Sequence, residues 1–209
     1  TEPQSESAVA THSSLYTVDG ETTESSSETY ASNTEDTNAV LVERLGILTM
    51  TSVDINKTGD TTGDYTSGIN TAVAVISKGQ LTLNQSNITT NGLGAAGMIV
   101  SGEGTQLEAN DTSVYTSGES SPVIIVREDA SAVITSGTLS TEGADSPSIL
   151  LLGGRLTLTG VKLTSKSGDI LRVLSGDNFL TLDQTAISAM PTLAEEATLE
   201  LHLQNGASF

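Results

Sequence analysis

The chain repeats an apolar pattern about every 25 residues, and this repeat restricts its possible folds more than any other feature. Three columns of apolar positions can be aligned along the 209 residues. The first column contains Val42, Val75, Val100, Val126, Leu150 and Val173. The second contains Leu48, Leu81, Leu107, Ala132, Leu156 and Leu180. The third contains Ile55, Ile88, Val114, Leu139, Leu163 and Ile187, at spacings of 33, 26, 25, 24 and 24 residues.

The local pattern inside each copy indicates short β-strands. Apolar and polar residues alternate in the Leu-Thr-Leu triplets at 81–83, 156–158 and 180–182, as in a strand with one buried face. Glycine recurs after the third column at Gly59, Gly92, Gly118, Gly143 and Gly168, where corners are expected. We therefore predict an all-β fold, a right-handed parallel β-helix (β-solenoid) with three short strands per coil. An antiparallel sandwich would also place turns at short intervals, but it has no reason to repeat in blocks of three strands.

The repeat also predicts the domain boundaries. Residues 1–14 lack the pattern and are expected to form an extended or disordered arm, followed by one β-helix domain at 15–209. The long first interval indicates an insertion that loops out at 56–70, and Tyr30 fits the third column of an earlier coil. The last residues, LELHLQNGASF, resemble a second strand with no evident cap. Candidate end surfaces for self-association are Leu15, Val18, Leu199, Leu201, Leu203 and Phe209.

Composition narrows the possible functions. Trp and Cys are absent, so the narrow core must be aliphatic, and disulfide and thiolate chemistry are excluded. The net charge of −18 repels phosphate backbones, which argues against nucleic acid as a partner. No apolar run is long enough to span a membrane as a helix, so no membrane insertion is expected. A chain rich in Thr and Ser and free of Cys suits an exported bacterial protein.

The segment 29–60 carries a more specific pattern. It contains Tyr30 and Ser32, then Asn38-Ala39-Val40, and later Leu48-Thr49, Ile55, Lys57 and Gly59-Asp60. This pattern resembles secreted and cell-surface parallel β-helix proteins of bacteria, in the style of adhesin-like and autotransporter-passenger repeats. The resemblance implies an extracellular surface protein without a defined ligand.

The outward positions beside the columns do not predict an enzyme. No face is expected to place two carboxylates on adjacent coils next to a basic residue, as hydrolysis or calcium-assisted polysaccharide cleavage would require. Glu108 and Asp111 come closest to such a pair. His12 and His202 lie at opposite ends of the chain, and Arg127 is expected to be a solvated corner charge.

Two weaker patterns remain as alternatives. Asp60 and Asp64 place two oxygen donors in the insertion, which makes them a candidate calcium site, and no other cofactor is expected. One outward Thr per coil suggests ice binding, but Glu108 and Val133 interrupt the column.

Without a catalytic constellation, we predict a non-catalytic extracellular structural or adhesive protein that self-associates end to end into a fibre or stalk. The alternative is a monomeric adhesin or carbohydrate-binding module with a cell-surface or glycan ligand; a polysaccharide lyase or hydrolase and an ice-binding protein are less favoured.

Overall fold

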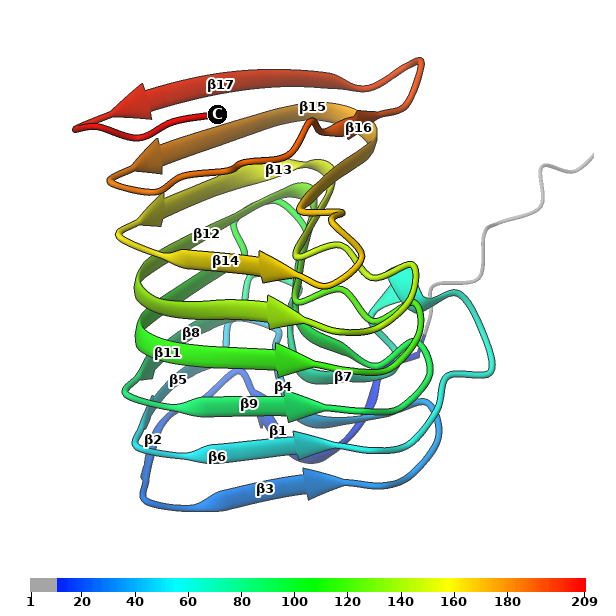
Figure 1. Ribbon diagram of the computed structural model, residues 1–209. Coiled ribbons are helices and arrows are strands. Elements are labelled where there is room, and N and C mark those ends of the chain that lie inside the picture. Colours follow the sequence, from blue (N-terminus) through cyan, green and yellow to red (C-terminus); the bar gives the residue numbers. More distant parts are fainter. Residues whose placement is uncertain (1–10) are drawn as a thin grey trace, which may run out of the picture.

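The computed structural model describes residues 11–209 as a β-solenoid of about eight turns, in which the strands stack into three parallel sheets (Figure 1). The first sheet contains β1 (Ser13–Asp19), β4 (Thr37–Glu43), β7 (Thr71–Ile76), β10 (Ala96–Ser101) and β16 (Thr192–Leu193). The second contains β2 (Thr22–Ser26), β5 (Ile47–Thr51), β8 (Gln80–Asn84) and β17 (Thr198–Gln204). The third contains β3 (Thr29–Ser32), β6 (Asp54–Lys57), β9 (Asn87–Thr90) and β14 (Lys162–Ser165).

Four long strands bend around the corners and so belong to more than one sheet. They are β11 (Gln106–Thr116), β12 (Ile124–Thr141), β13 (Ile149–Thr159) and β15 (Leu171–Asp183). Every pairing between strands is parallel, as expected when each coil stacks on the one before it. The described part of the chain therefore has the predicted all-β solenoid fold.

The pairing register places the second and third columns as the sequence suggested. Leu48, Leu81 and Leu107 follow one another on β5, β8 and β11, and the line continues through Ala132, Leu156 and Leu180. Tyr30 pairs with Ile55, and the third line continues through Ile88, Val114, Leu139 and Leu163. Ile187 is buried in the same core.

The first column contains one error. The register runs from Val42 through Val75 and Val100 to Val126, but Val126 pairs with Leu151 rather than with Leu150. Leu151 in turn pairs with Val173. Leu150 pairs with Ile125 and lies on the opposite side of the first sheet, in a separate apolar cluster.

Corner glycines allow the coils to stack closely. A Cβ atom on Gly118 would lie 1.9 Å from the carbonyl oxygen of Gly92, and one on Gly143 would lie 1.8 Å from that of Gly118. Neither residue has a positive φ, so close backbone approach, rather than turn geometry, requires glycine here. Ser146 strengthens the same corner, because its hydroxyl donates to the Gly118 carbonyl at 3.0 Å.

The expected boundaries shift slightly in the structure. Ser13 and Ser14 belong to β1 rather than to the arm, whose first ten residues lie outside the described part of the chain. Asn56 and Lys57 are part of β6, so the insertion starts after them. Among residues 11–209, no helix has the length and apolar character needed to cross a membrane.

Candidate functional site

The N-terminal end of the solenoid is an open sheet edge. Within the described chain, β1, β2 and β3 each pair with one strand of the next coil and have no partner on the outer side. Tyr16 and Tyr30 pack against each other at this end with ring centroids 4.9 Å apart, and the Tyr30 hydroxyl is 2.6 Å from that of Ser25. The two contact residues predicted at this end, Leu15 and Val18, differ in their exposure to solvent. Leu15 is exposed but on the outward face of its strand, and Val18 is completely buried and so is unavailable to a partner.

In the part of the chain that the structure describes, the C-terminal coil has a stacked neighbour on one side and exposes more apolar surface than the N-terminal coil. β17 pairs with β15, and Leu199, Leu201 and Leu203 stack on Asn178, Leu180 and Leu182. Leu199 and Leu201 are partly covered, whereas Leu203 is 47% exposed and Phe209 is 42% exposed. Two further exposed residues, Met190 and Leu193, lie in the last coil and were not among the predicted contacts. An apolar surface of this kind at a strand edge is a feature of association sites.

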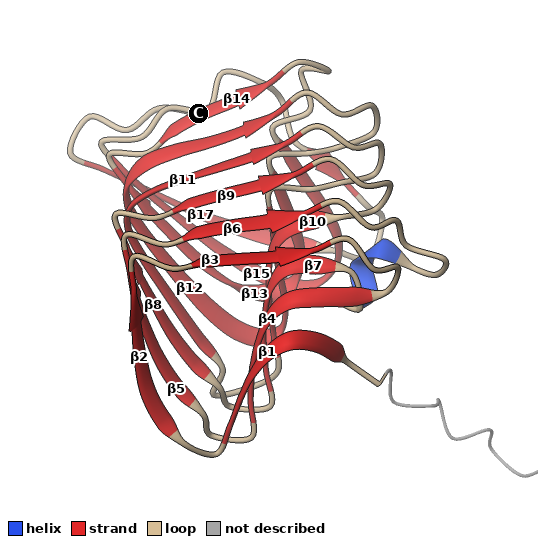
Figure 2. Cartoon of the chain, turned by 90° about the horizontal axis from the view of Figure 1, so that it is seen from below, coloured by secondary structure: helices blue, strands red, loops and turns tan. Residues whose placement is uncertain are grey.

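The insertion does not loop out into solvent. Residues 58–70, which include the short 3₁₀ helix η1 (Tyr65–Ser67), fold back over the outer face of the first sheet (Figure 2). There Tyr65 packs against the second apolar cluster, which consists of Leu41, Ala74, Ile76, Ala96, Ile99, Ile125 and Leu150. Arg127 holds the segment in place, because its Nη1 donates to the Thr66 carbonyl at 2.6 Å. Arg127 is therefore a structural contact rather than a solvated corner charge.

The two candidate calcium ligands are engaged in separate hydrogen bonds. Asp60 Oδ1 accepts the Leu93 amide at 2.8 Å, and Asp64 Oδ1 accepts the Thr66 amide at 2.9 Å as the N-cap of η1. The nearby Asp36, which the sequence did not single out, accepts the Thr62 amide at 2.9 Å. Burial opposes the charge on Asp36, but hydrogen bonds from the side chain and amide of Thr62 and from the side chain of Thr61 outweigh it and lower the pKa of the carboxyl. No group of three or more potential metal ligands gathers within residues 11–209, and calcium binding stays a prediction.

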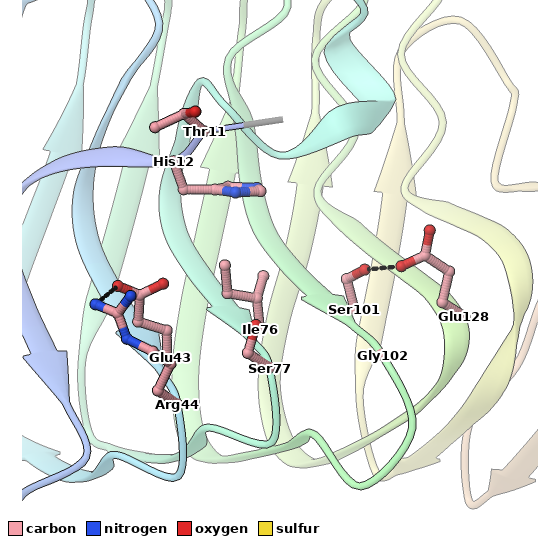
Figure 3. A pocket seen from close by; sticks show the side chains of 9 residues that line it. All are labelled: Thr11, His12, Glu43, Arg44, Ile76, Ser77, Ser101, Gly102 and Glu128. Atoms are coloured by element: carbon pink, nitrogen blue, oxygen red, sulfur yellow. Dashed lines mark hydrogen bonds and ion pairs between the residues drawn. The ribbon is translucent and has the colours of Figure 1, made fainter. Parts of the chain in front are cut away.

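One cavity is an open groove on the outer side of the first sheet, with a volume of about 640 Å³ (Figure 3). His12 lies above it, near the insertion, and its Nε2 is 3.2 Å from the Ser67 carbonyl oxygen. Glu43 and Arg44 form one wall, where Arg44 pairs with Glu43 at 2.8 Å and also binds Asp19.

Ser101 and Glu128 form the opposite wall of this groove. The Ser101 hydroxyl donates to Glu128 at 2.6 Å, and this bond lowers the pKa of Glu128 against the opposing effect of burial.

Asp19, Glu43 and Arg44 correct one expectation, because two carboxylates on paired strands do lie beside a basic residue. The sequence analysis did not predict this contact, because Arg44 lies 25 residues after Asp19 and reaches it only when the coils are stacked. A similar group joins Arg172 to Asp145 and Asp169. In both groups one arginine pairs with both carboxylates, so it offsets one of their two negative charges. Glu43 and Glu128 lie on strands separated by β7 and β10, about 14 Å at the usual strand spacing, which is wider than the carboxylate pairs of glycosidases.

Comparison with protein-family profiles, curated proteins and solved structures finds no match for this chain. The fold alone therefore defines its class, which is that of the β-solenoid proteins. The resemblance to secreted bacterial β-helix proteins is supported at the level of this fold.

Proposed function

We propose that the chain is a non-catalytic extracellular protein with a structural or adhesive role, whose copies associate end to end into a fibre or stalk. The observation that carries this proposal is the pair of open ends. Within residues 11–209, the parallel strands at one end lack an outer partner, and the last coil at the other end exposes four large apolar side chains. Exposed backbone donors and acceptors at a strand edge are a template for another strand.

The register of the solenoid suggests how two copies would meet. If a second copy continued the stack, β2 of that copy would lie on β17 of the first. Leu201 would then stack on Thr23, and Leu203 would stack on Ser25, both of which face the core. A contact of this head-to-tail kind does not close on itself, so it extends into a filament.

Charge opposes this contact and makes it sensitive to salt. The N-terminal coil carries Asp19, Glu21, Glu24 and Glu28, and the C-terminal coil carries Glu195, Glu196 and Glu200. Repulsion between exposed charges is screened beyond about 8 Å at physiological ionic strength. We therefore expect association to strengthen as salt is added, unlike an assembly held together by surface ion pairs.

Sedimentation velocity and negative-stain electron microscopy across a salt series test the proposal. The unaltered chain is expected to form rods that lengthen with salt and with protein concentration. Leu203→Asp is expected to abolish this growth, because it places a charge in the apolar end contact. Thr157→Asp adds the same charge to a lateral strand of the second sheet and serves as the matched control.

Two outcomes would overturn the proposal. The first is a chain that stays a single short rod at high concentration and high salt. The second is equal assembly by the Leu203→Asp variant and by the unaltered chain, since the C-terminal coil would then not be the contact.

A further inference from the structure

A second groove, of about 490 Å³, lies on the outer face of the third sheet, away from both ends of the solenoid. Its floor is made of β9 and of the third-sheet parts of β11 and β12, which pair in register. Tyr115 stands in the middle of this face, between Thr89 of the preceding coil and Ser140 of the following one. Its side chain is 36% exposed.

Tyr115 differs from the other aromatic residues of the described chain. Tyr16 and Tyr30 pack on each other at the N-terminal end, and Tyr65 covers the second apolar cluster. Phe179 is covered by the guanidinium group of Arg155, which lies 3.9 Å from the ring centroid, and Phe209 belongs to the last coil. Tyr115 is therefore the aromatic ring that this part of the chain leaves on an open lateral face. The other positions in its column carry small or polar side chains.

The groups around Tyr115 are mostly neutral hydrogen-bonding side chains, and two carboxylates, Asp54 and Glu142, lie near them. Ser113, Thr138 and Ser140 offer hydroxyls, each of which can donate and accept. Asn87 offers an amide whose nitrogen donates to Asp54 at 3.1 Å, and this leaves the amide oxygen as an acceptor. Burial raises the pKa of the Tyr115 hydroxyl, and the charge of Glu142 acts in the same direction, so the hydroxyl stays a donor at neutral pH.

From this arrangement we infer that the groove around Tyr115 binds a neutral polysaccharide chain. An aromatic ring with a polar edge offers a flat apolar surface to the C–H groups of a sugar ring, and the surrounding hydroxyls and amide can bond its hydroxyls. The net charge of −18 disfavours uronate-rich or sulfated polymers. The groove crosses successive stacked strands and is open to solvent, so it can take the interior of a long polysaccharide chain as well as its end.

This binding does not depend on end-to-end association. The groove belongs to the third sheet, whereas the proposed end contacts come from the first and last coils. The two proposals can therefore fail separately, and the Leu203→Asp variant should bind polysaccharide as the unaltered chain does.

Affinity electrophoresis tests the inference, with mixed-linkage β-glucan, xyloglucan and galactomannan as neutral probes and polygalacturonate as the anionic probe. At least one neutral polymer is expected to retard the chain. Tyr115→Ala should weaken that binding by about tenfold or more, as expected when a central aromatic contact is removed. Tyr115→Phe keeps the ring and should retain most of the binding. Val133→Ala removes an exposed apolar residue from the second sheet and is the control.

The thermal midpoints of all three variants should match that of the unaltered chain, so that a loss of binding is not a loss of folding. Three results would overturn the inference: no retardation by any neutral polymer, retardation by polygalacturonate alone, or undiminished retardation of the Tyr115→Ala variant.

Discussion

The middle coils and the last coil carry apolar ladders of the same kind but obtain different burial from them. Val75, Val100 and Val126 are completely buried, because each is covered by the coil below and by the coil above. Leu203 continues a ladder in the last coil and is 47% exposed, because it has a neighbour on one side alone. In a solenoid, therefore, the energetic weight of a repeat position depends on how many neighbouring coils cover it.

The largest expected effect comes from placing a charge in the middle ladder. Val100→Asp would bury an unpaired carboxylate between two coils and should lower the free energy of unfolding by about 4 kcal/mol or more. Leu203→Asp places the same group where solvent reaches it, and its effect should stay near 0.5 kcal/mol. Urea unfolding followed by circular dichroism measures both values. If Val100→Asp keeps the stability of the unaltered chain, the assignment of inside and outside is wrong.

A smaller effect is expected from adding one methyl group at a corner. On Gly118 the new Cβ would lie 1.9 Å from the Gly92 carbonyl oxygen, so the coils would have to move apart, at a cost of about 3 kcal/mol. Gly160 is the matched control. It has a φ of +61° and no neighbouring atom within 4 Å, so Gly160→Ala carries the left-handed backbone penalty alone, about 1 kcal/mol.

Thermal unfolding of these two alanine variants, measured side by side, tests whether contact between coils matters more than local backbone conformation. Equal losses would mean that the Gly118 corner relaxes around the added methyl group.

The second and third ladders could be predicted from the sequence because their strands alternate strictly between apolar and polar residues. The first ladder lacked this guide. The run Ile149–Leu152 is apolar throughout, so alternation could not distinguish Leu150 from Leu151 as the inward residue. The run is apolar because both faces of the first sheet are buried, one of them under the insertion. Unbroken apolar runs such as 72–76 already carried this signal, since sheets covered on both faces have such strands.

The surface groups were harder to predict, because they join residues that are distant in sequence. Arg44 and Asp19 come from two adjacent coils, and the groove around Tyr115 draws on four. A small shift in strand register or in side-chain direction would separate the residues of either group. The apolar pattern of the sequence specifies neither the register nor the direction of outward side chains. The ladders could be predicted because burial makes a one-residue slip costly. Outward residues are not subject to that constraint.

Lys57 is the one buried amine or carboxylate among residues 11–209, and it allows a smaller test of the contrast between covered and open positions. It faces inward between Ser32 and Thr90, is completely buried, and donates to the carbonyls of Thr34 at 2.9 Å and Gly59 at 2.8 Å. Burial lowers its pKa to about 8, against the opposing attraction of Asp60 and Asp36. In the unfolded chain the same amine has its ordinary pKa near 10.5.

This difference predicts how stability changes with pH. Between pH 8 and pH 10.5 the unfolded chain holds a proton on Lys57 that the folded chain has lost, so the free energy of unfolding rises with pH. We expect a gain on the order of 2 kcal/mol across this window and no contribution from Lys57 to the slope well below pH 8. Urea unfolding at pH 7.5, 9 and 10 measures the slope, and Lys57→Met removes the titrating group while keeping an unbranched side chain.

Tyrosines also titrate at the upper end of the range, but they are present in both proteins and largely cancel in the difference between them. Parallel pH dependence in the two proteins would mean that the amine of Lys57 is hydrated, and that the N-terminal coil covers this position less completely than the middle coils cover theirs.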